Sequence, residues 1–152
     1  MACLTGLSVL LNGCGAGVVE VDTPHLTGQA ARTCSDLVKA LPGTVDGAKR
    51  RSVQPSGAHA AAWGDPAIVL RCGVPMPRAF DRFASCQEAN GVGWFVPEEQ
   101  ITGRPEAITM TTIGRAVNVE VSLPEEHWPP ASAMVDLAPA IKKTVPETRP
   151  CV

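Results

Sequence analysis

The stretch AITMTTIGRAVNVEVS, residues 107–122, alternates apolar and polar side chains on both sides of Gly114-Arg115. Alternation with a period of two indicates strands, and glycine in the first position of a two-residue loop favours a type II′ hairpin. Pairing outward from that turn sorts the side chains into two faces. One face receives Thr112–Val117, Met110–Val119 and Ile108–Val121; the other receives Thr111–Asn118 and Thr109–Glu120. The sequence therefore predicts a half-buried antiparallel hairpin.

A second strand is predicted within AWGDPAIVLRCGVP, residues 62–75. The apolar run Ala67–Val74 is bordered by turn residues and is typical of a central, buried strand. It contains Arg71 and Cys72, which allows two interpretations: a thiol activated by a cation, or a cysteine in a disulfide. Neighbouring residues of a strand point to opposite faces, so Arg71 would face away from Cys72. This favours the disulfide.

Two helices are predicted near the ends of the chain. Thr27–Leu41 has an apolar face at helical spacing, and Ser132–Val145 has another, although Pro139 predicts a late start or a kink. Shorter strands are expected at Lys49–Val53 and Val92–Val96. The sum is an α+β fold: a mostly antiparallel sheet with two helices packed on one face, stapled by disulfides.

The first 14 residues, MACLTGLSVLLNGC, are uncharged and mostly apolar or small. This segment is too short to span a bilayer but has the length of the apolar region of a secretory signal. Its end, LNGC, resembles the lipobox of bacterial lipoproteins, which predicts a lipid on Cys14 and attachment to the membrane. An ordinary signal peptide or an uncleaved apolar segment is the alternative. Residues 15–152 are then expected to form a single domain.

The cysteine count supports export. Outside the predicted signal segment, and apart from Cys14, four cysteines remain: Cys34, Cys72, Cys86 and Cys151. An even number of cysteines in an exported chain predicts disulfides, and four allow three pairings. We favour Cys34 with Cys72 and Cys86 with Cys151. No Cys-x-x-Cys pair and no tight Cys/His spacing is present, so neither a metal site nor a cofactor is expected.

The composition argues against nucleic acid as a partner. The formal net charge is −2, and the 13 basic residues are scattered. The densest basic cluster, AKRR at residues 48–51, is interpreted as a solvated strand edge rather than a phosphate site. Aromatic residues make up only 4% of the chain, and tyrosine is absent, so stacking platforms for bases are not expected beyond the three tryptophans.

No familiar catalytic motif is present in the sequence. His25, His59 and His127 lie in separate loop-like segments. A polar and aromatic set is proposed for a shared pocket: Trp63, Asp65, Arg71, Trp94 and Arg115. A buried arginine needs a carboxylate partner, and Asp65 and Glu120 are the two alternatives for Arg71.

At Cys34–Leu37 (Cys-x-x-Leu), LPG, AWGDPAIVLRCGVP, GVGWF and TTIGRAVNVEVSLP, the chain resembles the actinobacterial DUF3515 family. These are small, exported or membrane-anchored proteins of unknown function. The resemblance implies a cell-envelope location and supports the Cys34–Cys72 pairing, but it implies no reaction.

Two functions from different classes follow. The first is a non-catalytic envelope lipoprotein, or a secreted protein, that binds an envelope protein or glycolipid. The second is a small envelope hydrolase or transferase, which would need an acid, a base and an oxyanion donor that converge in one cleft. For the second, His59, Asp65 and residues 125–127 are the groups to examine.

Overall fold

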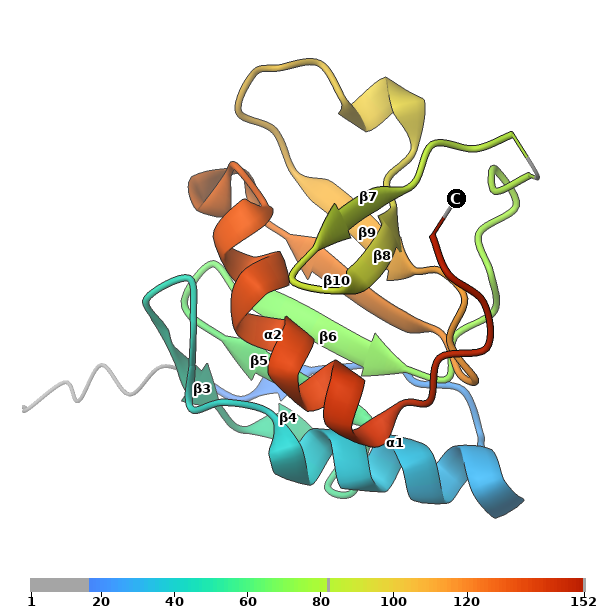
Figure 1. Cartoon of the computed structure of the whole chain (residues 1–152). Helices are drawn as coiled ribbons and strands as arrows, with labels where there is room; N and C mark the ends of the chain where they lie inside the picture. The colour runs from blue at the N-terminus through green and yellow to red at the C-terminus, as the bar shows by residue number, and fades with distance from the viewer. Residues whose placement is uncertain (1–16, 82, 152) are drawn as a thin grey trace, which may run out of the picture.

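The computed structural model describes residues 17–81 and 83–151, so the predicted signal segment and Cys14 lie outside the described residues. It confirms the predicted α+β fold, with two helices on one face of a large antiparallel sheet (Figure 1). The helices are α1 (Gly28–Ala40) and α2 (Ala131–Thr144), and two single 3-10 turns are η1 (Glu98–Gln100) and η2 (Glu125–His127).

The large sheet has eight strands in the order β2-β3-β5-β6-β10-β9-β8-β7, and every neighbouring pair is antiparallel. Its strands are β2 (Thr44–Val45), β3 (Ala48–Arg51), β5 (Ala60–Trp63), β6 (Ile68–Cys72), β7 (Gln87–Ala89), β8 (Val92–Phe95), β9 (Ile108–Thr112) and β10 (Val119–Leu123). A separate parallel pair is formed by β1 (Val19–Glu20) and β4 (Val53–Gln54). The predicted central strand is confirmed as β6, between β5 and β10.

The core lies between the helices and the sheet. Alternate residues of β6, β10 and β9 point toward the helices and are buried: Ile68, Leu70, Cys72, Val119, Val121, Leu123, Ile108 and Met110. α1 contributes Cys34 and Leu37 to this core, and α2 contributes Met134, Leu137 and Ile141. Burial of these apolar side chains is the main stabilising term of the fold.

α2 differs from its prediction at one point. It begins at Ala131 and continues through Pro139, so of the two predicted alternatives, a late start or a kink, the late start is wrong. Pro139 lies on the exposed side of the helix, while Leu137 and Ala138 before it and Ala140 and Ile141 after it are buried. Packing of both halves against the core outweighs the backbone hydrogen bond that proline cannot donate.

The hairpin forms, but its predicted register is wrong. Met110 pairs with Val121 and Ile108 with Leu123, two residues further along β10 than predicted. The predicted two-residue turn is replaced by a connection over residues 113–118. The backbone of this connection binds the C-terminal tail: Gly114 O accepts hydrogen bonds from the N–H groups of Thr148 and Arg149. Those bonds replace the tight turn.

Two disulfides confirm the favoured pairing. Cys34 of α1 is bonded to Cys72 of β6, with 5.5 Å between their Cα atoms, and both side chains are fully buried. Cys86, just before β7, is bonded to Cys151 in the tail, with 5.9 Å between their Cα atoms. The first bond ties a helix to the middle of the sheet. The second ties the end of the described chain to the residue before β7, the strand at one edge of the large sheet.

Candidate functional site

One row of side chains crosses the sheet on the face opposite the helices. The register of β8, β9, β10 and β6 aligns Phe95, Thr111, Glu120 and Arg71 on this face, since Cys72, the next residue of β6, faces α1. The connection between β6 and β7 crosses the same face, because its Phe80 ring packs edge-on against Phe95 at a centroid distance of 5.4 Å. We call this surface the helix-free face.

Arg71 and Glu120 form an ion pair in the middle of the helix-free face. They are direct cross-strand neighbours, and both Nε and Nη2 of Arg71 donate to Oε1 of Glu120, with the Nε bond at 3.1 Å. Nη1 of Arg71 donates to the carbonyl oxygen of Asp22 at 3.3 Å. Of the two carboxylates considered for Arg71, the structure selects Glu120. Glu120 is the more buried partner, 13% exposed against 35% for Arg71.

A cleft of about 450 Å³ opens beside this ion pair. We call it the Arg71 cleft. It is lined by residues from β6, β10, the N-terminal segment and the β6–β7 connection: Asp22, Thr23, Pro24, Arg71, Val74, Pro75, Met76, Pro77, Arg78 and Glu120. Two arginines and two carboxylates among largely apolar walls make it a site for polar or charged groups rather than a dry cavity.

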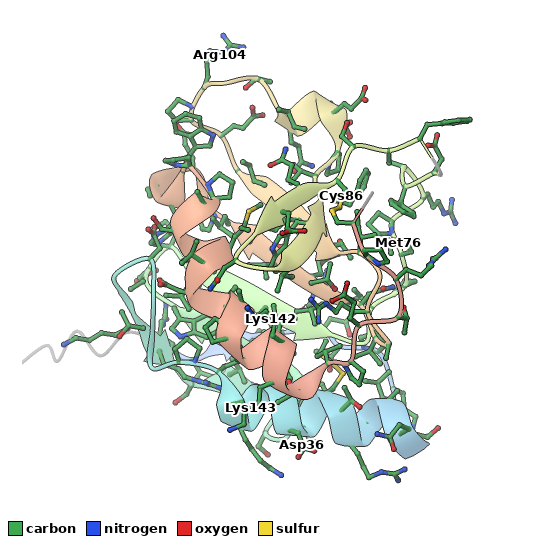
Figure 2. All side chains as sticks on the ribbon, in the orientation of Figure 1. Asp36, Met76, Cys86, Arg104, Lys142 and Lys143 are labelled. Atoms are coloured by element: carbon green, nitrogen blue, oxygen red, sulfur yellow. A yellow bond between two sulfur atoms is a disulfide. The ribbon has the colours of Figure 1, made fainter. Side chains whose placement is uncertain are left out.

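A second cavity lies further along the same connection. It has a volume of about 540 Å³, and we call it the tail cavity because the C-terminal tail forms one wall. Its lining residues are Phe80, Asp81, Ala84, Cys86, Ile113, Arg149 and Pro150. Figure 2 labels Met76 of the Arg71 cleft and Cys86 of the tail cavity on the same side of the molecule. The described residues of the β6–β7 connection, 74–81 and 83–86, thus contribute walls to both.

The structure does not bring the five predicted pocket residues together. Of this set, Arg71 lines the Arg71 cleft, whereas Trp63 and Trp94 are fully buried. Trp63 donates its indole N–H to the carbonyl oxygen of Pro42, and the indole N–H of Trp94 has no partner among the described residues. The two tryptophans belong to the core side of the sheet and not to a ligand site.

Asp65 and Arg115 have separate structural partners. Asp65, 76% exposed, lies 3.5 Å from Nη1 of Arg51. Arg115 lies 3.6 Å from the carboxylate of Glu147 in the tail and donates to the carbonyl oxygens of Val145 and Gly91. Arg115 therefore fastens the tail.

The AKRR segment is not a solvated strand edge. It forms β3, which β2 covers on one side and β5 on the other. Arg50 donates to the carbonyl oxygens of Leu41 and Val38, and its guanidinium lies 5.6 Å from the ring centroid of Trp63. Desolvation by burial lowers the pKa of Arg50. Sequence reasoning missed this role, because the arginine's partners come from α1 and its C-terminal end.

The groups named for a hydrolase do not converge. His59 precedes β5 and Asp65 follows it, so the four-residue strand separates them by about 13 Å or more. His127 Nδ1 instead lies 2.8 Å from Asp46 Oδ2, at the same end of β5 as Asp65. This pair joins η2 to the β2–β3 turn. Because His127 and Asp46 are 81 residues apart, no local sequence pattern could predict their contact.

A serine–histidine contact was also missed by sequence reasoning. Ser35 Oγ of α1 lies 3.2 Å from His59 Nε2. The Ser35 hydroxyl also donates to the carbonyl oxygen of Ala31 at 2.8 Å. A hydroxyl has one hydrogen, so in this arrangement His59 Nε2–H donates to Ser35 rather than accepting from it. This polarity is opposite to that of a histidine acting as the base for a serine nucleophile.

Within residues 17–81 and 83–151 there is no group of three or more His, Cys, Asp or Glu side chains placed to hold a metal ion. In the same ranges, no helix has both the length and the apolar character needed to cross a membrane.

The fold and its bonds define a class of protein: a small α+β domain, stapled by two disulfides that indicate a location outside the cytoplasm. Within that class, the chain belongs to the family described as "Protein of unknown function (DUF3515)", whose model matches residues 2–150. A search of curated proteins returned no match. A search of solved structures returned none either.

Proposed function

We propose that this protein is a non-catalytic binding module of the cell envelope, which holds an envelope protein or lipid on its helix-free face. The observation that carries this proposal is the pair of cavities on that face, both partly walled by described residues of the β6–β7 connection. This connection lies over a sheet that a buried disulfide ties to α1. Binding residues are commonly found on loops that a rigid scaffold positions.

The proposed anchor is a lipid on Cys14, which follows from the lipobox-like LNGC. Each buried CH₂ of an acyl chain contributes about 0.8 kcal/mol to membrane attachment, so two or more chains hold a protein firmly. We expect the Cys14→Ala variant to leave the membrane fraction for the soluble extracytoplasmic fraction. If the Cys14→Ala variant stayed in the membrane fraction, lipid anchoring would be contradicted. The binding role is tested separately, by the crosslinking experiment below.

Photo-crosslinking tests the binding role. A photoreactive amino acid replaces Met76, at the Arg71 cleft, and in a matched control it replaces Asp36, which is exposed on α1 and labelled at the bottom of Figure 2. Irradiation of intact envelopes should give a discrete adduct from position 76 and none from position 36. Equal labelling at both positions, or none at position 76, would contradict a partner on the helix-free face.

The second candidate function is a small envelope hydrolase, and the Ser35–His59 contact is the observation that favours it. The hydrogen bond from the Ser35 hydroxyl to the carbonyl oxygen of Ala31 argues against a hydrolase, because the serine proton is donated to the helix backbone and not to His59. A fluorophosphonate probe discriminates between the two functions. Labelling that disappears in the Ser35→Ala variant would support the hydrolase, and absence of labelling in the folded wild-type protein would count against a serine nucleophile.

A further inference from the structure

The C-terminal tail closes the tail cavity from one side. After α2, the tail runs along the β9–β10 connection and forms hydrogen bonds with it: Ala116 N–H donates to Pro146 O, and the N–H groups of Thr148 and Arg149 donate to Gly114 O. The Cys86–Cys151 disulfide then joins the tail to the opposite wall. The cavity is thus framed by three segments far apart in sequence and fastened by a covalent bond.

The walls of the tail cavity are mainly apolar. Phe80, Ala84, Ile113 and Pro150 line it together with the disulfide-bonded Cys86. Its volume of about 540 Å³ lies in the range of small-molecule sites, about 300–1,000 Å³. Such walls accept a hydrocarbon chain, because burial of apolar surface is favourable at about 25 cal/mol per Å².

Among the described residues of the lining, Asp81 and Arg149 are charged, and the two are not equivalent. The Asp81 carboxylate is used within its own loop, where Oδ1 accepts a hydrogen bond from the N–H of Phe83 at 2.7 Å. The exposed Arg149 guanidinium makes no hydrogen bond or ion pair with any residue of the described ranges. A cation without a partner beside apolar walls is complementary to an anion that carries an apolar chain.

An exposed aromatic side chain lies beside the tail cavity. Phe83 is 80% exposed and lines a smaller adjoining cavity that shares Asp81 and Ala84 with the tail cavity. Glu98 and Glu99 line the same adjoining cavity, so acidic side chains lie close to the exposed ring. The surroundings of the tail cavity are therefore mixed, and the apolar surface that would receive an acyl chain belongs to its interior.

We infer that the tail cavity binds an amphiphile with a single acyl chain and an anionic head, the chain lying between Phe80 and Ile113 and the head on Arg149. This inference rests on the proposed binding function and names the ligand class. A fatty acid and a lysophospholipid share the required chemistry. The two sources differ in the size of the head, and direct binding measurements distinguish them.

Binding of palmitate, lysophosphatidylglycerol and uncharged hexadecanol to the soluble domain tests the inference, with native mass spectrometry and competition against a fluorescent fatty acid as readouts. The Arg149→Glu variant should weaken binding of the anions about tenfold or more, since a hydrogen bond to a charged group contributes about 1.5–3 kcal/mol. Binding of hexadecanol should not change. Ala84→Trp, which fills the cavity, should weaken all three.

Two arginine controls locate the site. Arg104→Glu alters an exposed loop arginine, labelled at the top of Figure 2, that does not line the tail cavity, and should leave binding unchanged. If Arg78→Glu, and not Arg149→Glu, weakened anion binding, the ligand would lie in the Arg71 cleft. That result would overturn the inference but leave the proposed function intact.

Failure of the folded wild-type protein to bind any of the three amphiphiles would likewise overturn the inference. The envelope crosslink at position 76 would still report on the proposed function. A thermal unfolding curve close to that of the wild type shows that each variant is folded. Arg149 is exposed, so its substitution leaves the core untouched.

Discussion

At the scale of single residues, the pairing of Arg71 with Glu120 is the feature on which the helix-free face depends. Both are charged, and neither is fully solvated. Such a pair adds little to stability relative to apolar residues, yet removal of one partner leaves the other charge partly desolvated and unpaired. The pair therefore holds a guanidinium at the Arg71 cleft in a fixed position.

The Glu120→Ala variant should lower the free energy of unfolding by about 1–3 kcal/mol, because Arg71 loses its carboxylate partner. Urea denaturation measures this change. The matched control is Asp36→Ala, which removes a carboxylate 3.5 Å from Lys39 in a pair that is 64% and 76% exposed, and should cost less than about 0.5 kcal/mol. Equal effects of the two variants would contradict a structural role for the Arg71–Glu120 pair.

Gly93 provides the space in which the second disulfide lies on β8. A Cβ atom at this position would stand 2.8 Å from Sγ of Cys151 and 3.0 Å from Sγ of Cys86. We expect Gly93→Ala to lower the free energy of unfolding by about 1–3 kcal/mol through overpacking. In a Cys86→Ser/Cys151→Ser background the same substitution should cost clearly less, as a double-mutant cycle by chemical denaturation will show. If Gly93→Ala destabilised the disulfide-free protein as much as the wild type, the added methyl group would clash with something other than the disulfide.

At the scale of elements, the alternation of apolar and polar residues predicted which face of the sheet each side chain occupies better than it predicted which residues pair across the strands. The β9–β10 hairpin was predicted with the correct residues facing the core, although its register is shifted by two. A shift of one residue exchanges the two faces, whereas a shift of two preserves them, so burial patterns cannot detect it. In the structure the backbone groups of Gly114 and Ala116 form hydrogen bonds with the tail, and local turn rules carry no information about such a contact.

The candidate site was less predictable than the fold for the same reason. Arg71–Glu120 joins residues 49 positions apart and was one of two alternatives that the charges allowed. Arg149 carried no signal, because its significance depends on the tail folding back over Ile113. Trp63 and Trp94 were proposed for a pocket on the basis of residue type, but strand alternation directs both toward the helices. Long-range packing decided each of these outcomes.

The two disulfides should differ in which elements they protect. Loop-closure entropy assigns each a stabilisation of about 4 kcal/mol, for sequence separations of 38 and 65 residues. Removal of Cys34–Cys72 (Cys34→Ala/Cys72→Ala) should expose the amides of α1 to hydrogen exchange, since this bond ties α1 to β6. Removal of Cys86–Cys151 should affect mainly residues 145–151. Equal loss of protection across the sheet in both variants would contradict this separation.

At the scale of the whole molecule, the four described cysteines act as structural bonds. One disulfide joins the first helix to the middle of the sheet, and the other closes the tail over a cavity. The first bond lies in the core on the helix side of the sheet, and the second lies beside the tail cavity on the helix-free face. This arrangement belongs to a protein that folds in an oxidising compartment, and it accounts for Cys72 beside Arg71 without any thiol chemistry.

The most direct test of this account is mass spectrometry of the native, folded protein after alkylation without reduction. We expect no label on Cys34, Cys72, Cys86 or Cys151, and proteolysis should yield peptides linked as Cys34–Cys72 and Cys86–Cys151. Reduction in denaturant should then expose all four to alkylation. Alkylation of Cys72 in the native protein, or any other pairing of the four cysteines, would contradict the account.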